Sequence, residues 1–211
     1  MIPLMPAAAQ FKALLAPQDY YRRERAADFK SEYFAGEVFA MAGGSVNHSL
    51  IKANVVRALG NALARKGGGC RTFDSDLRVK IPQTGLRTYP DVSVICGPVT
   101  LDEEDEAGET VTNPTVIVEV LSDSTERYDR GTKFDHYQSI PSLKQYVLVS
   151  QDQARVETFL RQEEGTWQYA AFTGMEAVAT LAALAIPLPL AEVFAGVEFP
   201  ASPPLRLLPK A

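Results

Sequence analysis

Two short apolar runs, each carrying one carboxylate, constrain this chain more than any other feature of its sequence. They are residues 90–95 (PDVSVI) and 116–121 (VIVEVL). In the second run Glu119 interrupts five Val, Ile and Leu residues, so a strand there places a carboxylate in a nearly continuous hydrophobic surface. An unpaired charge in such a place is costly or becomes protonated. We therefore expect Glu119 to meet either a bound cation or a basic side chain.

The alternation of side chains along a strand shows which residues share a face with each carboxylate. Glu119 shares a face with Ile117 and Leu121, and Asp91 shares a face with Ser93. If the two strands are neighbours, the carboxylates lie side by side and a divalent cation is their natural counter-ion. A second interpretation stays open for each residue. Glu119 is then half of a buried ion pair with an arginine, and Asp91 caps a turn after a proline.

The spacing of the apolar residues predicts an α+β (mixed α/β) fold, with a mixed central β-sheet flanked by helices and an N-terminal helical segment. Helices are expected over residues 10–30, from the N-cap Ser45 to the glycines at 67–69, and from about Thr125 to Ser139. Strands are expected over residues 31–41 (a hairpin), 73–81, 90–95, 116–121, 144–149, 155–160 and 167–172. The acidic stretch over residues 97–114 lacks apolar periodicity and is expected to be an exposed loop.

Length and composition indicate a soluble globular chain with one main domain. The chain has 211 residues, of which 46% are apolar and 22% charged. We expect a helical extension over residues 1–30, one domain over 31–199 and a loose tail over 200–211. The net charge of −5 does not indicate a non-specific nucleic-acid binder. The longest uncharged stretch, residues 177–191, is too short to span a bilayer.

The two cysteines give no sign of a metal site. Cys70 and Cys96 lack the paired spacing of zinc ligands and have no histidine cluster beside them. We expect two free thiols in a reducing cytoplasm. No basic region precedes the first apolar residues, so the N-terminus is not predicted to be a signal peptide.

Lys133 is the basic side chain that the pattern places nearest to the carboxylates. It lies about two turns into the helix expected from Thr125, from which it could reach back over the strand ends and stabilise a developing negative charge. Taken alone, a helical lysine is more often solvated. Asp129 and Tyr137 of the same segment are interpreted as structural residues.

Two further residues, both in the N-terminal half, are considered as site residues. Glu37 begins the second strand of the expected hairpin, and it is either an additional metal-binding carboxylate or an exposed hairpin residue. His48 lies in the first turn of the following helix, where a lone histidine is more often a surface or packing residue than a ligand.

A basic group is expected to contact phosphate if the ligand is nucleic acid. Along the strand expected over residues 73–81, basic and apolar residues alternate, so the basic ones should face solvent. The candidates for phosphate contacts are Arg78, Lys80 and Arg87.

Taken together, these segments resemble the Uma2 family, which is abundant in bacteria. The likeness covers about residues 33–194, and it rests on Gly36-Glu37-Val38, the helix near His48, Tyr89-Pro90-Asp91-Val92, residues 118–122, Thr125, Asp129-Arg130-Gly131, Lys133, Tyr137 and residues 145–149. The resemblance implies the PD-(D/E)xK fold of restriction endonucleases.

Residue by residue, the resemblance implies a set of site assignments. Asp91 and Glu119 would bind the metal with the carbonyl of Val120, and Glu37 would be an extra acidic member. Leu121 stands where the simple nuclease motif has lysine. The resemblance implies that this lysine has moved to the following helix, as Lys133.

The expected function is that of an endonuclease that uses Mg²⁺ or Mn²⁺ to hydrolyse DNA phosphodiester bonds. A homodimer is expected for cleavage of both strands, because one active site cuts one strand. Two alternatives stay open: a non-catalytic binding or regulatory protein on a nuclease-like scaffold, and a metal-dependent hydrolase of another substrate. A salt bridge from Glu119 to an arginine would favour the binding protein. Asp91 and Glu119 close together, with Lys133 beside them, would favour the enzyme.

Overall fold

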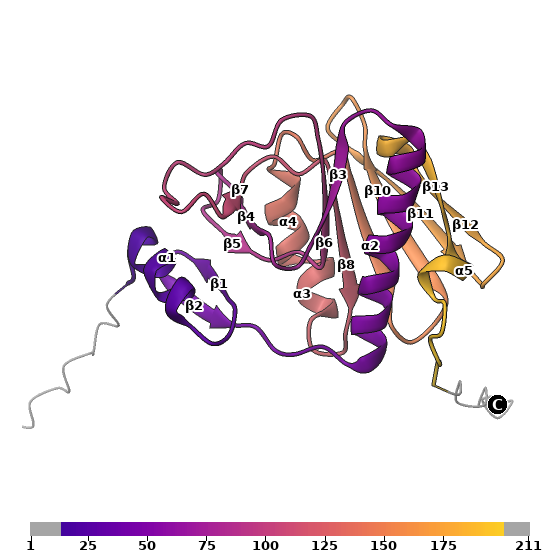
Figure 1. Ribbon diagram of the computed structural model, residues 1–211, viewed down its shortest axis with the longest axis horizontal. Helices are drawn as coiled ribbons and strands as arrows, with labels where there is room; N and C mark the ends of the chain where they lie inside the picture. The colour runs from indigo at the N-terminus through magenta and orange to yellow at the C-terminus, as the bar shows by residue number, and fades with distance from the viewer. Residues whose placement is uncertain (1–13, 201–211) are drawn as a thin grey trace, which may run out of the picture.

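The computed structural model describes residues 14–200, which form three β-sheets and the helices around them (Figure 1). Residues 1–13 and the predicted tail beyond Pro200 lie outside the described residues. The helices are α1 (Pro17–Ala26), α2 (Val46–Lys66), α3 (Glu126–Arg130), α4 (Thr132–Gln138), the 3₁₀ helix η1 (Ala182–Leu184) and α5 (Leu190–Val193).

A six-stranded mixed sheet forms the centre of the molecule. Its strands, in the spatial order β11-β10-β9-β8-β6-β3, are β3 (Cys70–Asp74), β6 (Val92–Cys96), β8 (Val116–Leu121), β9 (Gln145–Ser150), β10 (Arg155–Arg161) and β11 (Trp167–Thr173). β8 and β9 are parallel, and the other neighbours are antiparallel. The predicted mixed sheet is therefore confirmed.

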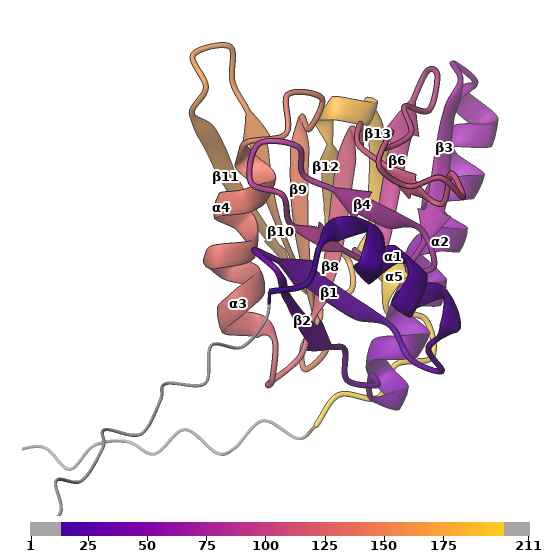
Figure 2. The ribbon, with the colours of Figure 1, turned by 90° about the vertical axis from the view of Figure 1, so that its left-hand side faces the viewer.

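Two further layers cover the faces of this sheet. One face packs on α2, on α5 and on the pair β12 (Val178–Leu181) and β13 (Ile186–Pro189). The other face packs on α4 and on a five-stranded sheet. In Figure 2 this smaller sheet and α1 lie in front of the six-stranded sheet. The smaller sheet has the order β2-β1-β5-β4-β7, with strands β1 (Ser31–Phe34), β2 (Glu37–Ala40), β4 (Arg78–Lys80), β5 (Arg87–Thr88) and β7 (Thr110–Val111).

Strand β8 divides the core as its alternation predicts. Val118 and its neighbours of the same parity pack among the side chains of α2, whereas Ile117 and Leu121 pack with Tyr137 of α4. All six residues of β8 are buried. Glu119, which has the parity of Ile117, is thus placed on the face that meets α4 and the smaller sheet.

The predicted hairpin and the predicted long helix both form. β1 and β2 pair across the turn Ala35-Gly36, whose φ angles are both positive, as a tight hairpin turn requires. At the start of α2 the Ser45 side chain accepts the backbone N–H of His48 at 3.0 Å. The Ser45 hydroxyl also donates to Gln151, just beyond β9, so α2 begins near the carboxyl end of β9.

The prediction of one strand over residues 73–81 is wrong, because the chain turns in the middle of this segment. The Asp74 carboxylate accepts the backbone N–H of Asp76 at 3.0 Å, an arrangement typical of a side-chain-stabilised turn. The two halves become β3 and β4 and join different sheets. The helix predicted from Thr125 to Ser139 is likewise interrupted at Gly131, which separates α3 from α4.

The acidic stretch is only in part the exposed loop that its composition predicts, because two of its acidic side chains are buried. Residues 102–109, here called the acidic strap, lie along the basic strand β4. Asp102 and Asp105 are buried: Lys80 Nζ lies 2.7 Å from an Asp102 oxygen, and an Arg78 nitrogen lies 3.3 Å from Asp105. The pairing buries Asp102, Asp105 and Arg78. Local sequence periodicity does not reveal such a contact, because the partners are distant along the chain.

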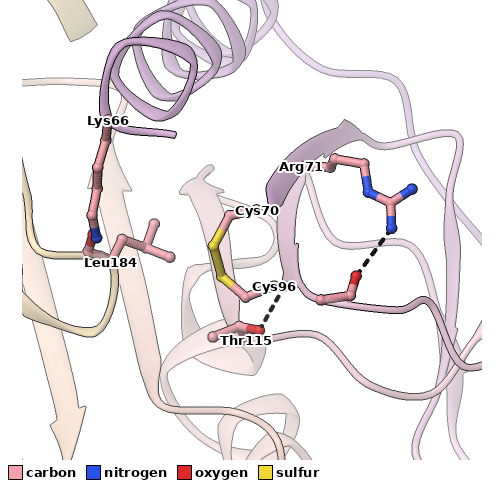
Figure 3. The surroundings of a disulfide bond; sticks show 7 residues. Lys66, Cys70, Arg71, Cys96, Thr115 and Leu184 are labelled. Carbon is pink, nitrogen blue, oxygen red and sulfur yellow. Dashed lines mark hydrogen bonds between the residues drawn. A yellow bond between two sulfur atoms is a disulfide. The ribbon is translucent and has the colours of Figure 1, made fainter. Parts of the chain in front are cut away.

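The expectation of two free thiols is also wrong. Cys70 of β3 and Cys96 of β6 stand directly opposite in the antiparallel pair and form a disulfide (Figure 3). The cysteines are 26 residues apart in sequence, so only the strand pairing brings them together. In residues 14–200, no helix combines the length and hydrophobicity needed to cross a membrane.

Candidate active site

Asp91 and Glu119 face each other across neighbouring antiparallel strands. Val92 of β6 is opposite Val118 of β8 in the antiparallel pair. Asp91, which precedes Val92, therefore stands opposite Glu119, which follows Val118. The backbone N–H of Asp91 donates to Glu119 Oε2 at 3.2 Å, and the Val120 N–H donates to Asp91 Oδ2 at 2.8 Å. The predicted adjacency is confirmed, and each carboxylate is fixed by the backbone of the other strand.

Lys133 reaches Glu119 from α4. Its Nζ lies 2.9 Å from Glu119 Oε1, and Tyr137, one helical turn further on, donates its hydroxyl to the same oxygen at 2.8 Å. Lys133 Nζ is also 3.4 Å from Asp129 Oδ1, one turn before it. Asp129 and Tyr137, interpreted from sequence as structural, therefore lie in contact with the candidate lysine or with Glu119.

A fourth carboxylate comes from the hairpin, but from its first strand. Lys133 Nζ lies 3.5 Å from Oε1 of Glu32, which also accepts the Thr88 hydroxyl, while Tyr128 donates to Glu32 Oε2 at 3.0 Å. Glu37, the hairpin carboxylate predicted from the sequence, begins β2 on the other side of the turn. The sequence signal for Glu32 is the alternation along β1, because Glu32 shares a strand face with Phe34, which packs against the core beside α4.

His48 adds a contact on the other side of Asp91. Its Nε2 lies 3.2 Å from Asp91 Oδ2, and the two side chains are 14% and 15% exposed. The side chains of Lys133 and Glu119 are only 6% and 3% exposed. The site is thus more open at Asp91 and His48 and closed at Lys133.

Negative charge exceeds positive charge in this cluster. We name Glu32, Asp91, Glu119 and Asp129 the carboxylate cluster; they surround the ammonium of Lys133, and His48 lies at the edge. Burial, together with the charges of Asp129 and Asp91, raises the pKa of Glu119 to about 8 against the opposing effect of Lys133. Burial also raises the pKa of Asp129. Burial is the main cause of both shifts, and neighbouring carboxylates add to it.

The pKa values of Asp91 and Lys133 move in the direction that keeps each group charged. Burial acts to raise the pKa of Asp91, but His48, the Val120 amide and Lys133 outweigh it and lower the pKa. Burial acts to lower the pKa of Lys133, but Glu119, Glu32 and Asp129 raise it well above its usual value. Lys133 is therefore a fixed ammonium at neutral pH.

The donor set fits a hydrated divalent cation better than a caged metal. In residues 14–200, no three His, Cys, Asp or Glu side chains gather in a way that could hold a metal ion. Mg²⁺ usually takes one or two protein carboxylates and keeps waters or substrate phosphates as its other ligands. Asp91 can supply one such ligand, because no hydrogen bond from the described residues reaches its Oδ1.

The basic residues chosen for phosphate contacts lie elsewhere. Arg78 and Arg87 are buried against tyrosine rings of α1 and β1, and with Lys80 they pair with the acidic strap. A shallow depression of about 690 Å³ lies over α3 and the start of α4. It is lined by Ser124, Arg127, Tyr128, Arg130, Gly131 and Thr132. Arg130 pairs with Glu126 and Glu157, whereas exposed Arg127 forms no ion pair with any described residue.

The comparisons with known proteins agree with this architecture. A crystal structure described as a "putative nuclease belonging to DUF820", from Anabaena variabilis, superposes with a TM-score of 0.63 over 80% of this chain and 91% of that one, at 19% identity. The fold is therefore of the nuclease-like class, as predicted. Residues 17–191 match the profile of Uma2, described as "Putative restriction endonuclease". The chain belongs to the Uma2 family.

Two cyanobacterial relatives support this membership. The uncharacterized protein slr1290 of Synechocystis sp. is 40% identical over 72% of this chain and 77% of its own length. The uncharacterized protein sll1609 of the same organism is 34% identical over 78% of this chain and 90% of its own length.

Proposed function

We propose that this protein is a metal-dependent endonuclease that hydrolyses phosphodiester bonds in DNA. The observation that carries the proposal is the buried pair Asp91 and Glu119 on neighbouring strands, with Lys133 Nζ 2.9 Å from Glu119 in a cluster rich in carboxylates. In residues 14–200, no arginine forms an ion pair with Glu119, so the contact expected of a purely structural arginine pair is absent. Membership of a family described as "Putative restriction endonuclease" supports the same assignment.

Asp91 and Glu119 would hold Mg²⁺ or Mn²⁺, together with the carbonyl of Val120. When bound, such an ion polarises a phosphoryl oxygen and lowers the pKa of a coordinated water. The excess of carboxylates over cations favours its binding, and the raised pKa of Glu119 means that binding displaces protons.

Lys133 would act through its positive charge and not as a base. Its pKa is raised by the surrounding carboxylates, so the ammonium has no free electron pair with which to take a proton. It would stabilise negative charge that develops on the phosphoryl group or orient the attacking water. Glu32, Asp129 and Tyr137 keep the ammonium and Glu119 in place.

The shallow depression over α3 and the start of α4 is the better candidate for contacts with the nucleic-acid backbone. Arg127 lines this depression and forms no ion pair within residues 14–200, and the hydroxyl-bearing residues Ser124 and Thr132 belong to the same lining. Arginine and hydroxyl side chains are common phosphate contacts. We therefore propose Arg127 as the phosphate contact. The three residues predicted for this role, Arg78, Lys80 and Arg87, are engaged by the acidic strap or by buried tyrosines.

The proposal is tested by cleavage of supercoiled plasmid and single-stranded DNA with Mg²⁺ or Mn²⁺, and with EDTA as the blank. Wild type is compared with Asp91→Asn and Glu119→Gln. Glu104→Gln is the matched control, since it also removes a carboxylate paired with basic side chains, but in the acidic strap. Metal-dependent nicking by wild type and Glu104→Gln, lost in the other two, is the expected result. Folded protein that binds no metal and cuts no strand would overturn the proposal.

A further inference from the structure

We propose that His48 is a positioning residue for Asp91: it holds one carboxylate oxygen so that the other is presented to the metal. The inference rests on the proposed function, since it concerns the same site. It goes beyond that function by giving a specific role to His48, which the sequence favoured as a surface or packing residue.

Two groups converge on a single oxygen of Asp91. His48 Nε2 lies 3.2 Å from Oδ2, and the Val120 N–H donates to the same Oδ2 at 2.8 Å. Two partners on one oxygen limit rotation of the carboxylate about its last bond. Oδ1 is then the oxygen left for a ligand, because no hydrogen bond from residues 14–200 reaches it.

The imidazole is itself held in place by its surroundings. The backbone N–H of His48 is bound by the Ser45 side chain at 3.0 Å, which fixes the first turn of α2. On the opposite edge of the ring, Gly44 leaves no spare room: a Cβ added there would lie 2.6 Å from His48 Nδ1. The ring is thus confined between the Gly44 backbone and the Asp91 carboxylate.

The position of His48 fits a role at the entry of the site. His48 and Asp91 are its more exposed members, while Lys133 and Glu119 are almost fully buried. A cation from solvent therefore meets Asp91 first. Residues that hydrogen-bond to metal ligands typically change metal affinity about 10- to 100-fold when they are removed.

The test measures Mn²⁺ affinity by electron paramagnetic resonance at one fixed pH, without nucleic acid. His48→Leu should weaken binding about 10- to 100-fold, and His48→Gln, whose amide can donate from a similar position, should restore most of the affinity. His136, the second histidine of the chain, lies on α4 against the Phe34 ring, so His136→Leu is the matched control and should bind as wild type. Equal affinity of His48→Leu and wild type would overturn the inference.

A second pair of variants moves the ring without removing it. Gly44→Ala should displace His48 and weaken Mn²⁺ binding, whereas a Cβ at Gly43 meets nothing within 4 Å, so Gly43→Ala should have no effect. Unchanged affinity in Gly44→Ala would count against the inference even if His48→Leu failed to fold.

Asp91→Asn separates this inference from the proposed function. If Asp91→Asn abolishes Mn²⁺ binding while the His48 and Gly44 variants bind normally, the metal site stands and only the role of His48 falls. If Asp91→Asn binds Mn²⁺ as tightly as wild type, the proposed metal site itself is wrong, and the inference falls with it.

Discussion

Lys133 is the shared counter-ion of three carboxylates. Loss of Lys133 should therefore destabilise the folded protein more than loss of any one of the three. Glu119, Glu32 and Asp129 all lie within 3.5 Å of its Nζ. Removal of Glu119 leaves the ammonium two partners. Removal of the ammonium leaves the carboxylates without their shared counter-charge. Breaking a buried pair is costly when an uncompensated charge stays behind.

We therefore expect Lys133→Met to lower the free energy of unfolding by about 3–5 kcal/mol, and Glu119→Gln by about 1–2 kcal/mol. Burial already raises the pKa values of Glu119 and Asp129, and in Lys133→Met the loss of the ammonium raises them further. The variant is then most stable below the unfolded values and weakens as pH rises. Urea titrations in EDTA at pH 5 and pH 8 measure both effects. A larger loss in Glu119→Gln than in Lys133→Met would contradict this account.

Glu157 gives the opposite dependence on pH. Burial acts to raise its pKa, but contacts from Tyr169, Arg130 and Arg155 lower it from 4.5 to about 2. A lowered pKa contributes stability that is complete above about 4.5 and is lost as pH falls through about 2. Glu157→Gln should cost about 2 kcal/mol near neutral pH, and the difference from wild type should shrink in urea titrations toward pH 2. A difference that stays constant from pH 7 to pH 2 would rule out the charge as its cause.

The hairpin β1–β2 matters for the site because β1 carries Glu32, which faces Lys133. Its turn depends on Gly36, whose φ is +85° and whose backbone is approached closely by Leu14. Gly165, in the turn between β10 and β11, has a similar φ of +82° but open space around it. Substitution of Gly165 therefore tests the cost of positive φ alone, whereas substitution of Gly36 tests the same cost together with a steric clash.

We expect Gly165→Ala to lower the free energy of unfolding by about 1 kcal/mol, since an alanine there is held at positive φ. Gly36→Ala should lose about 1–3 kcal/mol more, because its Cβ would lie 2.6 Å from the Leu14 Cβ. Thermal and urea unfolding of the two variants give the comparison. Equal losses would mean that Leu14 moves aside without cost.

The candidate site joins the layers of the whole molecule. Glu119 belongs to the six-stranded sheet, Glu32 to the five-stranded sheet and Lys133 to α4, so the buried ion pairs connect all three. The disulfide Cys70–Cys96 ties the edge strand β3 to β6, the strand that follows Asp91 (Figure 3). Both kinds of link hold together segments that are distant in sequence.

Reduction of the disulfide should destabilise the chain as a whole. A cross-link between residues 26 positions apart restricts the unfolded chain, which corresponds to about 3 kcal/mol in the loop-entropy description. Urea titrations with and without dithiothreitol should show this loss in wild type. The control Cys70→Ser/Cys96→Ser should match the reduced protein and not respond to reductant. A wild type that is equally stable in both conditions would show that the cross-link adds nothing.

The sequence by itself determined the features that depend on neighbours along the chain. The run around Glu119 specified a buried strand and the face of its carboxylate, the apolar spacing after Ser45 specified α2, and Ala35-Gly36 specified a hairpin turn. Each signal is a local period or a local conformational requirement, which needs no knowledge of distant partners. The family resemblance added the metal-binding and catalytic assignments of Asp91, Glu119 and Lys133, which stay predictions, whereas the family match confirms the resemblance itself.

Only the tertiary structure decided which distant segments meet. It put Glu32 rather than Glu37 against Lys133, drew His48 to Asp91, covered Arg78 with the acidic strap and joined Cys70 to Cys96. In every case the partners are separated in sequence by tens of residues. Their contact follows from strand pairing and layer packing, which satisfy the whole core at once. A local pattern shows which side chains need a partner, and the fold chooses the partner.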